Sequence, residues 1–329
     1  VIFKAVTFLQ IKRGIMMNST QVSYFTLAAY FDTGVLKYLF FIIIMSLYIL
    51  ILCANVLLIV IICMNRSLHE PMYLFLCSLF VNELYGSTGL FPFLLLQILS
   101  DIHTVPASFC FLQIYCVHSY GAVEYLNLAI MSYDRYLAIC YPLQYNTRMT
   151  SNKIAFVIPL VIRNVVIILV VVTLAGRLSF CFRNVINHCF CEHMALVELA
   201  CGSTAINSLV GLMFLFLVIV VDFLIITTSY IIIFSSVLRS RTSGVKALHT
   251  CVTHLVVISV SLIIVLTASL SYRVRNNLPA TIRVFLSTMY SLFPSCFNPI
   301  IYGIRTKEIR QHILKTLLCC RLVQTVPHS

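Results

Sequence analysis

Charged residues are scarce in this sequence, and that scarcity excludes a water-soluble domain. Of the 329 residues only 10% are charged and 61% are hydrophobic, with a mean hydropathy of +1.02. Apolar runs of at least about 18 residues predict membrane spans. The runs do not alternate apolar with polar residues, as the strands of a membrane barrel would. We therefore expect helices, which satisfy their own backbone hydrogen bonds in lipid.

Several functional patterns are also missing. The 22 Lys and Arg residues are spread over short loops and form no basic face, which argues against nucleic acid and favours contact with lipid headgroups. The sequence has no nucleotide-binding loop, no convincing metal-ligand cluster and no nucleophile–base pair, so we expect no enzyme. It also lacks the paired, broken spans of transporters built from internal repeats.

What is present is a series of seven apolar segments. They predict an all-α fold, a seven-transmembrane helix bundle, with spans at residues 38–63, 72–99, 110–139, 153–175, 208–238, 246–271 and 281–303. Residues 306–318 form an amphipathic pattern that suits a short helix on the membrane surface. We divide the chain into a tail (1–37), the bundle (38–303) and a surface helix with its tail (304–329). Residues 1–15 are expected to be a gene-model extension before Met16 or Met17.

Three features orient the bundle. Lys and Arg are more frequent on the side that holds Arg135 and the C-terminus, which favours a cytoplasmic C-terminus. Asn18 begins the glycosylation sequon Asn-Ser-Thr on the opposite side. That side also holds five cysteines, which favours an oxidising exterior; their spacing leaves the connectivity open. These are Cys110, Cys181, Cys189, Cys191 and Cys201.

Five motifs in order along the chain resemble those of vertebrate odorant receptors, which are rhodopsin-like G-protein-coupled receptors. The segment LHEPMY (68–73) is similar to the family pattern LHxPMY, and MSYDRYLAIC (131–140) with PLQY to MAYDRYVAICxPLxY. The remaining three are Ser229-Tyr230, KALHTC (246–251) with His254, and NPIIY (298–302). The resemblance covers about residues 17–318. It extends to the class I, fish-type branch, which is associated with water-soluble odorants such as acids.

The resemblance implies a receptor that binds a small odorant in the outer part of the bundle and activates a stimulatory, olfactory-type heterotrimeric G protein. It implies a plasma-membrane location with an extracellular N-terminus, in olfactory cilia. It also implies the disulfides Cys110–Cys191 and Cys181–Cys201, leaving Cys189 over. The chain departs from the family in having Ser261-Leu262 where Phe-Tyr is usual, Glu83 where Asp is usual, and no Trp.

Two carboxylates lie within predicted spans. A charge at membrane depth costs at least a few kcal/mol and needs a partner, so Glu83 and Glu124 are expected to face the bundle interior. By resemblance, Asn55 and Asn298 join them around a central ion and water site. Two close carboxylates must share a cation or a proton. We expect no cofactor other than a sodium ion here, and a structural hydrogen-bonded network without an ion is the open alternative.

The acid–base pair Asp134-Arg135 ends the third span on the cytoplasmic side. The acid can hold the guanidinium until a partner's helix end, rich in exposed carbonyls, receives it; simple snorkelling of Arg135 is the alternative. The residues expected to couple to a G protein are Asp134, Arg135, Tyr136, Tyr230, Lys246, His249 and Tyr302. Lys246 and His249 could equally serve as membrane anchors, and Cys319-Cys320 are either palmitoylated or idle.

A polar ligand site is expected at the outer side. His118 lies eight residues below Cys110, about 12 Å deeper in a helix, and Gly121 and Ala122 leave room for a ligand one turn further in. His193 follows Cys191 and hangs above the bundle. Arg273, about 40 Å along its helix from Lys246, could grip a carboxylate in a planar fork. Alternatively, Arg273 snorkels to headgroups and His118 is a core histidine.

Two further charges, Arg163 and Asp222, have no assigned role; they could pair if their depths match. Two other functions stay open. One is a receptor of the same shape used outside the nose, and the other is a small-solute transporter or channel. Ligand-dependent cyclic AMP that is lost in Arg135→Ala supports a receptor, whereas solute flux without a G protein supports a transporter.

Overall fold

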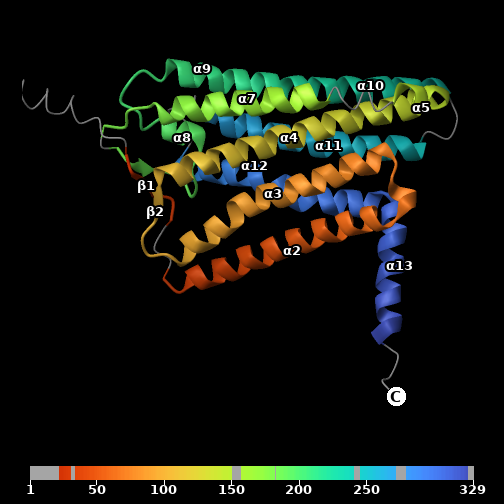
Figure 1. Ribbon diagram of the computed structural model, residues 1–329, viewed down its shortest axis with the longest axis horizontal. Helices are drawn as coiled ribbons and strands as arrows, with labels where there is room; N and C mark the ends of the chain where they lie inside the picture. The colour runs from red at the N-terminus through yellow and green to blue at the C-terminus, as the bar shows by residue number, and fades with distance from the viewer. Residues whose placement is uncertain are drawn as a thin grey trace, which may run out of the picture.

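The chain folds into a bundle of long helices with a small β-sheet at one end (Figure 1). The computed structural model describes residues 22–30, 34–149, 157–181, 183–240, 245–271 and 279–324. Within these residues, seven helical segments run along the bundle. They are α2 (Leu36–Met64), α3 (Pro71–Leu99), α4 (Ala107–Cys140), α7 (Val157–Gly176), α9 (Ala205–Phe214) continued by the π-helical turn η3 (Leu215–Val220) and α10 (Val221–Ser240), α11 (Val245–Ser271) and α12 (Ala280–Arg305).

The helices are apolar on the outside as well as within. Among the described residues, five segments are long and apolar enough to span a membrane, and a sixth, at 258–271, is apolar over a shorter stretch. On α2 the side chains of Ile42, Ile49 and Leu50 are more than half exposed, and only lipid makes that arrangement favourable. The predicted all-α, seven-helix membrane bundle is confirmed, and each described helix end lies within a few residues of the predicted span.

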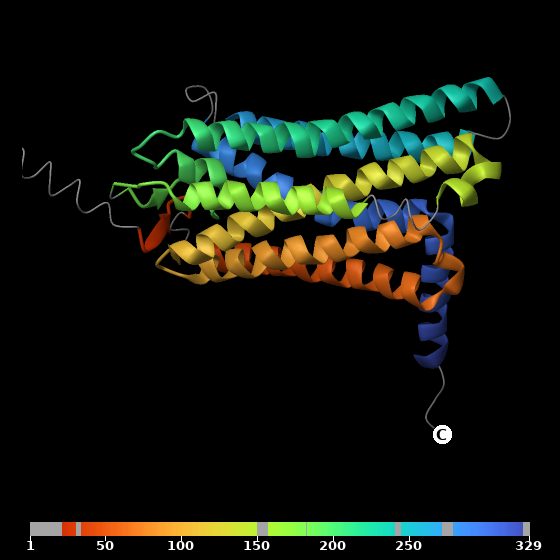
Figure 2. The same ribbon diagram turned by 45° about the horizontal axis from the view of Figure 1, so that its top comes forward.

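Helix α4 is the central element of the packing. It contacts α3 on one side and α7 and α10 on another, while α12 packs against α2, α3 and α11. The two views show α4 crossing between its neighbours along the length of the bundle (Figures 1 and 2). Since half of the residues of α4 are buried, this helix can carry polar side chains in its interior.

A three-stranded sheet covers one end of the bundle, which we call the sheet end. Strand β1 (Tyr24–Leu27) pairs antiparallel with β2 (Thr104–Pro106) and parallel with β3 (Val185–Ile186). Phe25 and Leu27 of β1 point inward and are almost completely buried. The sheet therefore joins the segment before α2 to the connection between α3 and α4 and to the connection that follows α7.

The opposite end, which we call the Arg135 end, carries short helices. They are the 3-10 turns η1 (Arg66–Leu68) and η2 (Pro142–Gln144), the helix α5 (Tyr145–Arg148), and α13 (Lys307–Gln324), which leaves the bundle at a steep angle (Figure 1). Ile309 of α13 is fully buried against the bundle. Helix α4 continues to Cys140, and η2 and α5 follow it closely.

Candidate functional site

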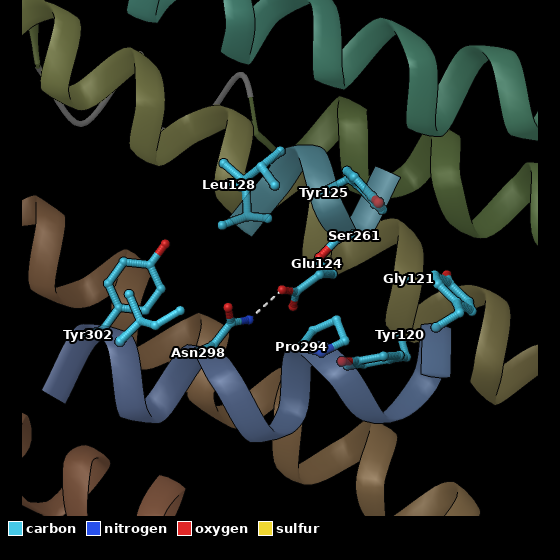
Figure 3. Close-up of a pocket in the computed structure, with 12 residues that line it drawn as sticks. Tyr120, Gly121, Glu124, Tyr125, Leu128, Ser261, Pro294, Asn298 and Tyr302 are labelled. Atoms are coloured by element: carbon cyan, nitrogen blue, oxygen red, sulfur yellow. Dashed lines mark hydrogen bonds between the residues drawn. The ribbon is translucent and has the colours of Figure 1, made fainter. Parts of the chain in front are cut away.

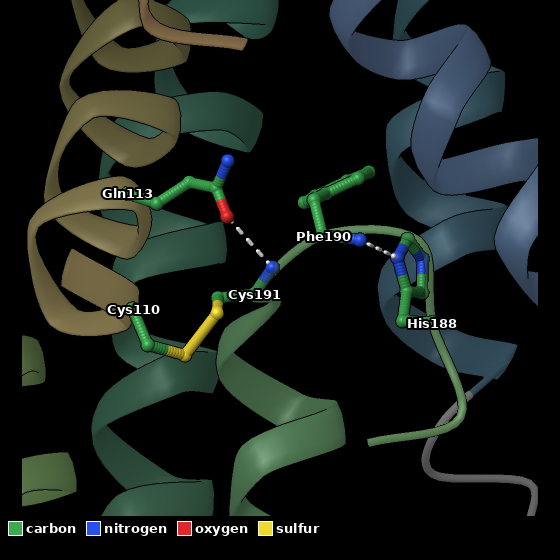
Figure 4. The surroundings of a disulfide bond; sticks show 5 residues. All are labelled: Cys110, Gln113, His188, Phe190 and Cys191. Atoms are coloured by element: carbon green, nitrogen blue, oxygen red, sulfur yellow. Dashed lines mark hydrogen bonds between the residues drawn. A yellow bond between two sulfur atoms is a disulfide. The ribbon is translucent and has the colours of Figure 1, made fainter. Parts of the chain in front are cut away.

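A loop strapped to α4 by a disulfide closes the sheet end of the bundle. Cys110 at the start of α4 bonds to Cys191 (Figure 4), and Cys181 bonds to Cys201. The Gln113 side chain accepts a hydrogen bond of 2.8 Å from the Cys191 amide, which fixes the loop one turn further down. Cys189 is a free thiol. Because Cys191 is anchored, the residues that follow it are held directly over the helices.

Those residues form the short helix α8 (His193–Val197) and face a cavity, which we call the sheet-end cavity. Glu192 caps α8 by accepting a 2.8 Å hydrogen bond from the Ala195 amide. The cavity has about 80 Å³ of room for the centre of a water molecule. Its lining includes His118, Glu192, His193, Phe214, Ala268 and Tyr290.

Two histidines meet in this cavity. The ring centroids of His118 and His193 lie 5.8 Å apart, edge to face, and Phe214 lies 5.2 Å from the His118 ring. His118 Nδ1 is 2.9 Å from the Ile114 carbonyl, so Nδ1 carries a proton in that hydrogen bond. A neutral His118 then presents Nε2 as an acceptor, which suits a ligand that donates a hydrogen bond.

The space expected beside Gly121 is occupied by Tyr290 in this structure. A Cβ added to Gly121 would collide with the Tyr290 hydroxyl, so the ring of Tyr290 already takes that space. Ala122 is fully buried among apolar side chains, and its carbonyl accepts from Asn164. A direct contact of a ligand with Gly121 or Ala122 stays a prediction. Arg273 and Asn18 lie outside the described residues.

The ionisable groups of the loop have pKa values set mainly by burial. Burial raises the pKa of Glu192 to about 7, although hydrogen bonds from the Ala195 and Met194 amides oppose the rise. Burial lowers the pKa of His188 to about 3, and its Nδ1 accepts a hydrogen bond from the Phe190 amide. The lip of the cavity therefore gains a negative charge as the pH rises through about 7.

Deeper in the bundle, Asn298 of α12 brings the two buried carboxylates together. Its Nδ2 donates to Glu83 of α3 and to Glu124 of α4, both at 2.6 Å (Figure 3 shows the bond to Glu124). The Tyr120 hydroxyl donates to Glu83 at 2.8 Å and lies 3.1 Å from the Ser295 hydroxyl. Both carboxylates are almost completely buried.

This carboxylate cluster requires one positive charge. A single amide nitrogen binds both acids, so their bonded oxygens can be no more than 2.6 + 2.6 = 5.2 Å apart. Among the described residues, no Lys or Arg forms an ion pair with Glu83 or Glu124. Two buried carboxylates at this separation cannot both be charged unless a cation or a shared proton lies between them.

The residues present suit either occupant. A small cavity between Glu124 and Asn298, which we call the carboxylate cavity, has about 20 Å³ of room for the centre of a water molecule. That is enough for one water or one ion, since about 10–15 Å³ suffices. Its lining is mainly apolar and does not include Glu83, but Glu124, Ser261 and Asn298 supply oxygen atoms, which hard cations prefer.

The prediction for this site was incomplete. Asn55 donates to the Ile51 carbonyl rather than to either acid, and its buried oxygen has no hydrogen-bond partner among the described residues. Tyr120, Ser295 and Asn82 were not foreseen. Asn82, whose amide lies 3.4 Å from Glu124, is next to Glu83 in the sequence. Tyr120 precedes Glu124 by one helical turn, so helical spacing could have indicated it.

At the Arg135 end, the Asp134 carboxylate has two partners, Tyr145 and Arg135. The Tyr145 hydroxyl of α5 donates to Asp134 at 2.7 Å, whereas Arg135 Nε lies 3.7 Å from the other oxygen. Tyr230 and Tyr302 are buried in one apolar cluster, with Tyr136 packed against it. The backbone of Lys246 and His249 belongs to α11, but their side chains lie outside the described part, as do those of Cys319 and Cys320.

The two unassigned charges lie near each other. Arg163 of α7 is 3.9 Å from Asp222 of α10, and its guanidinium also donates to the Asn164 side chain. Asp222 is buried and Arg163 is partly exposed. A lipid-facing arginine would be costly without such partners.

Comparison with known proteins fits this architecture. The sequence profile of the family described as olfactory receptor matches residues 44–320. Human olfactory receptor 52P1 is 38% identical over 264 residues, covering 79% of this chain and 82% of that receptor. Human olfactory receptor 52K1 is 37% identical over 270 residues (81% and 86%), and human olfactory receptor 51E2 is 35% identical over 273 residues (82% and 85%).

Olfactory receptors are multi-pass membrane proteins that bind odorants and signal through G proteins, and they are not enzymes. The seven-helix bundle and the family match over most of the sequence agree. This chain belongs to the olfactory receptor family.

Proposed function

We propose that a small polar odorant binds in the sheet-end cavity and that carboxylic acids are the first class to test. The observation that carries this proposal is the meeting of His118 and His193 under the strapped loop. An apolar cavity with a few converging polar groups is the usual form of a small-molecule site. Arg273 lies outside the described residues. By resemblance to the class I branch, we expect it to supply a fixed positive charge for an acidic odorant.

The pH of the medium enters this proposal through Glu192. Because the pKa of Glu192 is raised to about 7, the cavity lip is largely neutral at pH 6 and negative at pH 8. An anionic odorant would then bind more tightly at the lower pH, as long as the odorant itself stays ionised. An alcohol of the same length would show a smaller pH dependence.

We propose that the sheet end faces the exterior and that the N-terminus, with the sequon at Asn18, is extracellular. Disulfides persist in oxidising space, and both bonds lie at this end. The Arg135 end then faces the cytoplasm and a stimulatory, olfactory-type G protein. In the resting receptor, Tyr145 and Arg135 hold Asp134; on activation Arg135 is released toward the partner, with Tyr136, Tyr230, Tyr302, Lys246 and His249 around it.

We also propose that the carboxylate cluster of Glu83 and Glu124 holds one proton or one sodium ion in the resting receptor. Its support is the shared Asn298 donor and the size of the carboxylate cavity. A bound cation would supply only charge compensation. Asn298 would orient the two acids, and the Tyr120 hydroxyl would donate to Oε2 of Glu83, the oxygen that Asn298 does not bind.

A cyclic-AMP assay with an odorant panel tests the proposal. Straight-chain acids, alcohols and ketones are applied to cells that express the receptor, with surface level measured in parallel. We expect an odorant response that disappears in Arg135→Ala with surface expression intact. Arg273→Ala should weaken the response to acids and not to alcohols. Solute flux without G-protein dependence would instead support a transporter, and an unchanged acid response in Arg273→Ala would remove the anion hypothesis.

A further inference from the structure

One face of α12 runs from the sheet-end cavity to the carboxylate cluster. Ser287 and Tyr290 line the sheet-end cavity, and Tyr290, Pro294 and Asn298 line the carboxylate cavity. The spacing of three and then four residues places these side chains on one side of a helix. Tyr290 is therefore a wall of both cavities, and any ligand that fills the first cavity meets it.

The phenol of Tyr290 is seated against the backbone of α4. Its hydroxyl lies where a Cβ of Gly121 would be, so even an alanine at position 121 would have to displace the ring. Tyr290 also packs against the apolar cluster that includes Tyr125 of α4, Ile219 of η3 and Leu262 of α11. The ring is therefore part of the packing between the elements that enclose the two cavities.

Below Tyr290, the backbone of α12 is weakened. Pro294 has no amide hydrogen, so the carbonyl of Tyr290 lacks the donor that an uninterrupted helix would supply four residues later. Pro299 has the same effect on the carbonyl of Ser295. The turns that connect Tyr290 to Asn298 are therefore easier to bend than an ordinary helix, and proline positions are where helices kink.

Helix α11 supplies no aromatic ring for the same position. From Val245 to Ser271 it contains no Phe, Tyr or Trp. Its contribution to the carboxylate cavity is Ile258 and the small side chain of Ser261, and Leu262 packs nearby. A bulky side chain that separates the two cavities has to come from another helix, and Tyr290 is in place.

We propose that Tyr290 is the positioning residue that couples occupancy of the sheet-end cavity to the carboxylate cluster. A ligand that displaces the ring from Gly121 bends α12 at Pro294 and changes the hold of Asn298 on Glu83 and Glu124. This inference rests on the proposed binding of an odorant in the sheet-end cavity. It adds the path by which binding reaches the buried charges.

A double-mutant cycle between Tyr290 and Glu124 tests the coupling. The agonist is taken from the panel of acids, alcohols and ketones and must raise the Tm of the purified receptor, an effect that Ala268→Phe in the cavity wall abolishes. Four receptors are compared: wild type, Tyr290→Leu, Glu124→Gln and the double variant. Met289→Leu is the matched control, because Met289 is next to Tyr290 in the sequence but packs against the apolar cluster that includes Phe25 and Cys110.

In the wild-type background, we expect Glu124→Gln to change the EC50 of the agonist by at least about 5-fold, the lower end of allosteric coupling. In the Tyr290→Leu background the same substitution should change the EC50 by less than about 2-fold, since coupled sites become independent once their link is removed. Tyr290→Leu should also lower the maximal response more than it changes the agonist concentration needed for the Tm increase. Met289→Leu should leave the full Glu124→Gln effect.

Other variants keep the test decisive. If Tyr290→Leu does not reach the cell surface, Gly121→Ala displaces the ring through its clash with the Tyr290 hydroxyl while keeping the aromatic side chain, and the same loss of coupling is expected. Equal Glu124→Gln effects in both backgrounds, or no effect in wild type, would overturn the proposal while leaving the ligand site intact. If no agonist depends on Ala268, the proposed ligand site fails and the coupling proposal fails with it.

Discussion

Glu192 and His188 lie in the loop over the sheet-end cavity. Each makes the stability of the receptor depend on pH, and the two dependences have opposite signs. Burial raises the pKa of Glu192 from 4.5 to about 7, so the folded state binds more protons than the unfolded state between these values. Folding stability therefore falls as the pH rises through that window. Burial lowers the pKa of His188 from 6.5 to about 3, so its contribution is complete above pH 6.5 and is lost as the pH falls toward 3.

The size of each effect follows from the shift. One pKa unit corresponds to about 1.4 kcal/mol. The rise in the pKa of Glu192 from 4.5 to about 7 therefore changes the free energy of unfolding by about 3 kcal/mol. His188 (6.5 − 3 = 3.5 units) changes it by about 5 kcal/mol in the opposite direction. Between pH 4.5 and 6.5 the two slopes cancel, which conceals both in the wild type.

Two substitutions separate the slopes. Glu192→Gln removes the titration but keeps an oxygen that can accept from the Ala195 amide. His188→Asn removes the ring but keeps an acceptor for the Phe190 amide. The assay is the Tm of the purified receptor in detergent, from pH 4.5 to 7.5.

Relative to wild type, Glu192→Gln should become steadily more stable as the pH rises, and His188→Asn steadily less stable. The double variant should again be nearly flat. If the difference between Glu192→Gln and wild type is the same at every pH, Glu192 does not titrate in this range and the reasoning is refuted.

Two further predictions concern the other charged sites. Tyr145→Phe removes a 2.7 Å hydrogen bond to Asp134, and a bond to a charged group contributes about 1.5–3 kcal/mol. Agonist-free cyclic AMP per surface receptor should therefore rise about 10-fold. An unchanged level would show that Tyr145 does not restrain the resting state. Tyr141→Phe is the control. Arg163→Leu should lower the Tm of the purified receptor because it leaves Asp222 buried and unpaired, and adding Asp222→Leu should restore most of the loss; a double variant less stable than the single one would contradict this.

The helices could be predicted closely because lipid demands long apolar segments. The limits of α2 and α3 follow directly from the first two apolar runs. The sheet could not be predicted, because β1, β2 and β3 have only four, three and two residues and come from distant parts of the chain. The π-helical turn η3 lies inside a uniformly apolar run, so no residue marks it.

The candidate sites were predictable where burial of charge is costly. Glu83 and Glu124 could be placed in the interior because charges in a span need partners, resemblance added Asn298, and the structure brings all three together. Gly121 shows the limit of the sequence, because an absent side chain indicates space without saying what fills it. That the occupant is Tyr290 depends on how α12 packs against α4, which is a contact between residues far apart in the sequence.

Filling the sheet-end cavity tests the central claim, that an odorant acts from this site. Ala268 of α11 lines the cavity, and the exposed Thr267 beside it hydrogen-bonds to the Ile263 carbonyl. The measurement is the odorant-evoked cyclic AMP of Ala268→Phe and of the control Thr267→Val, each normalised to surface receptor. We predict that Ala268→Phe loses the odorant response while agonist-free cyclic AMP stays, and that Thr267→Val responds as wild type. An undiminished odorant response in Ala268→Phe would contradict the account.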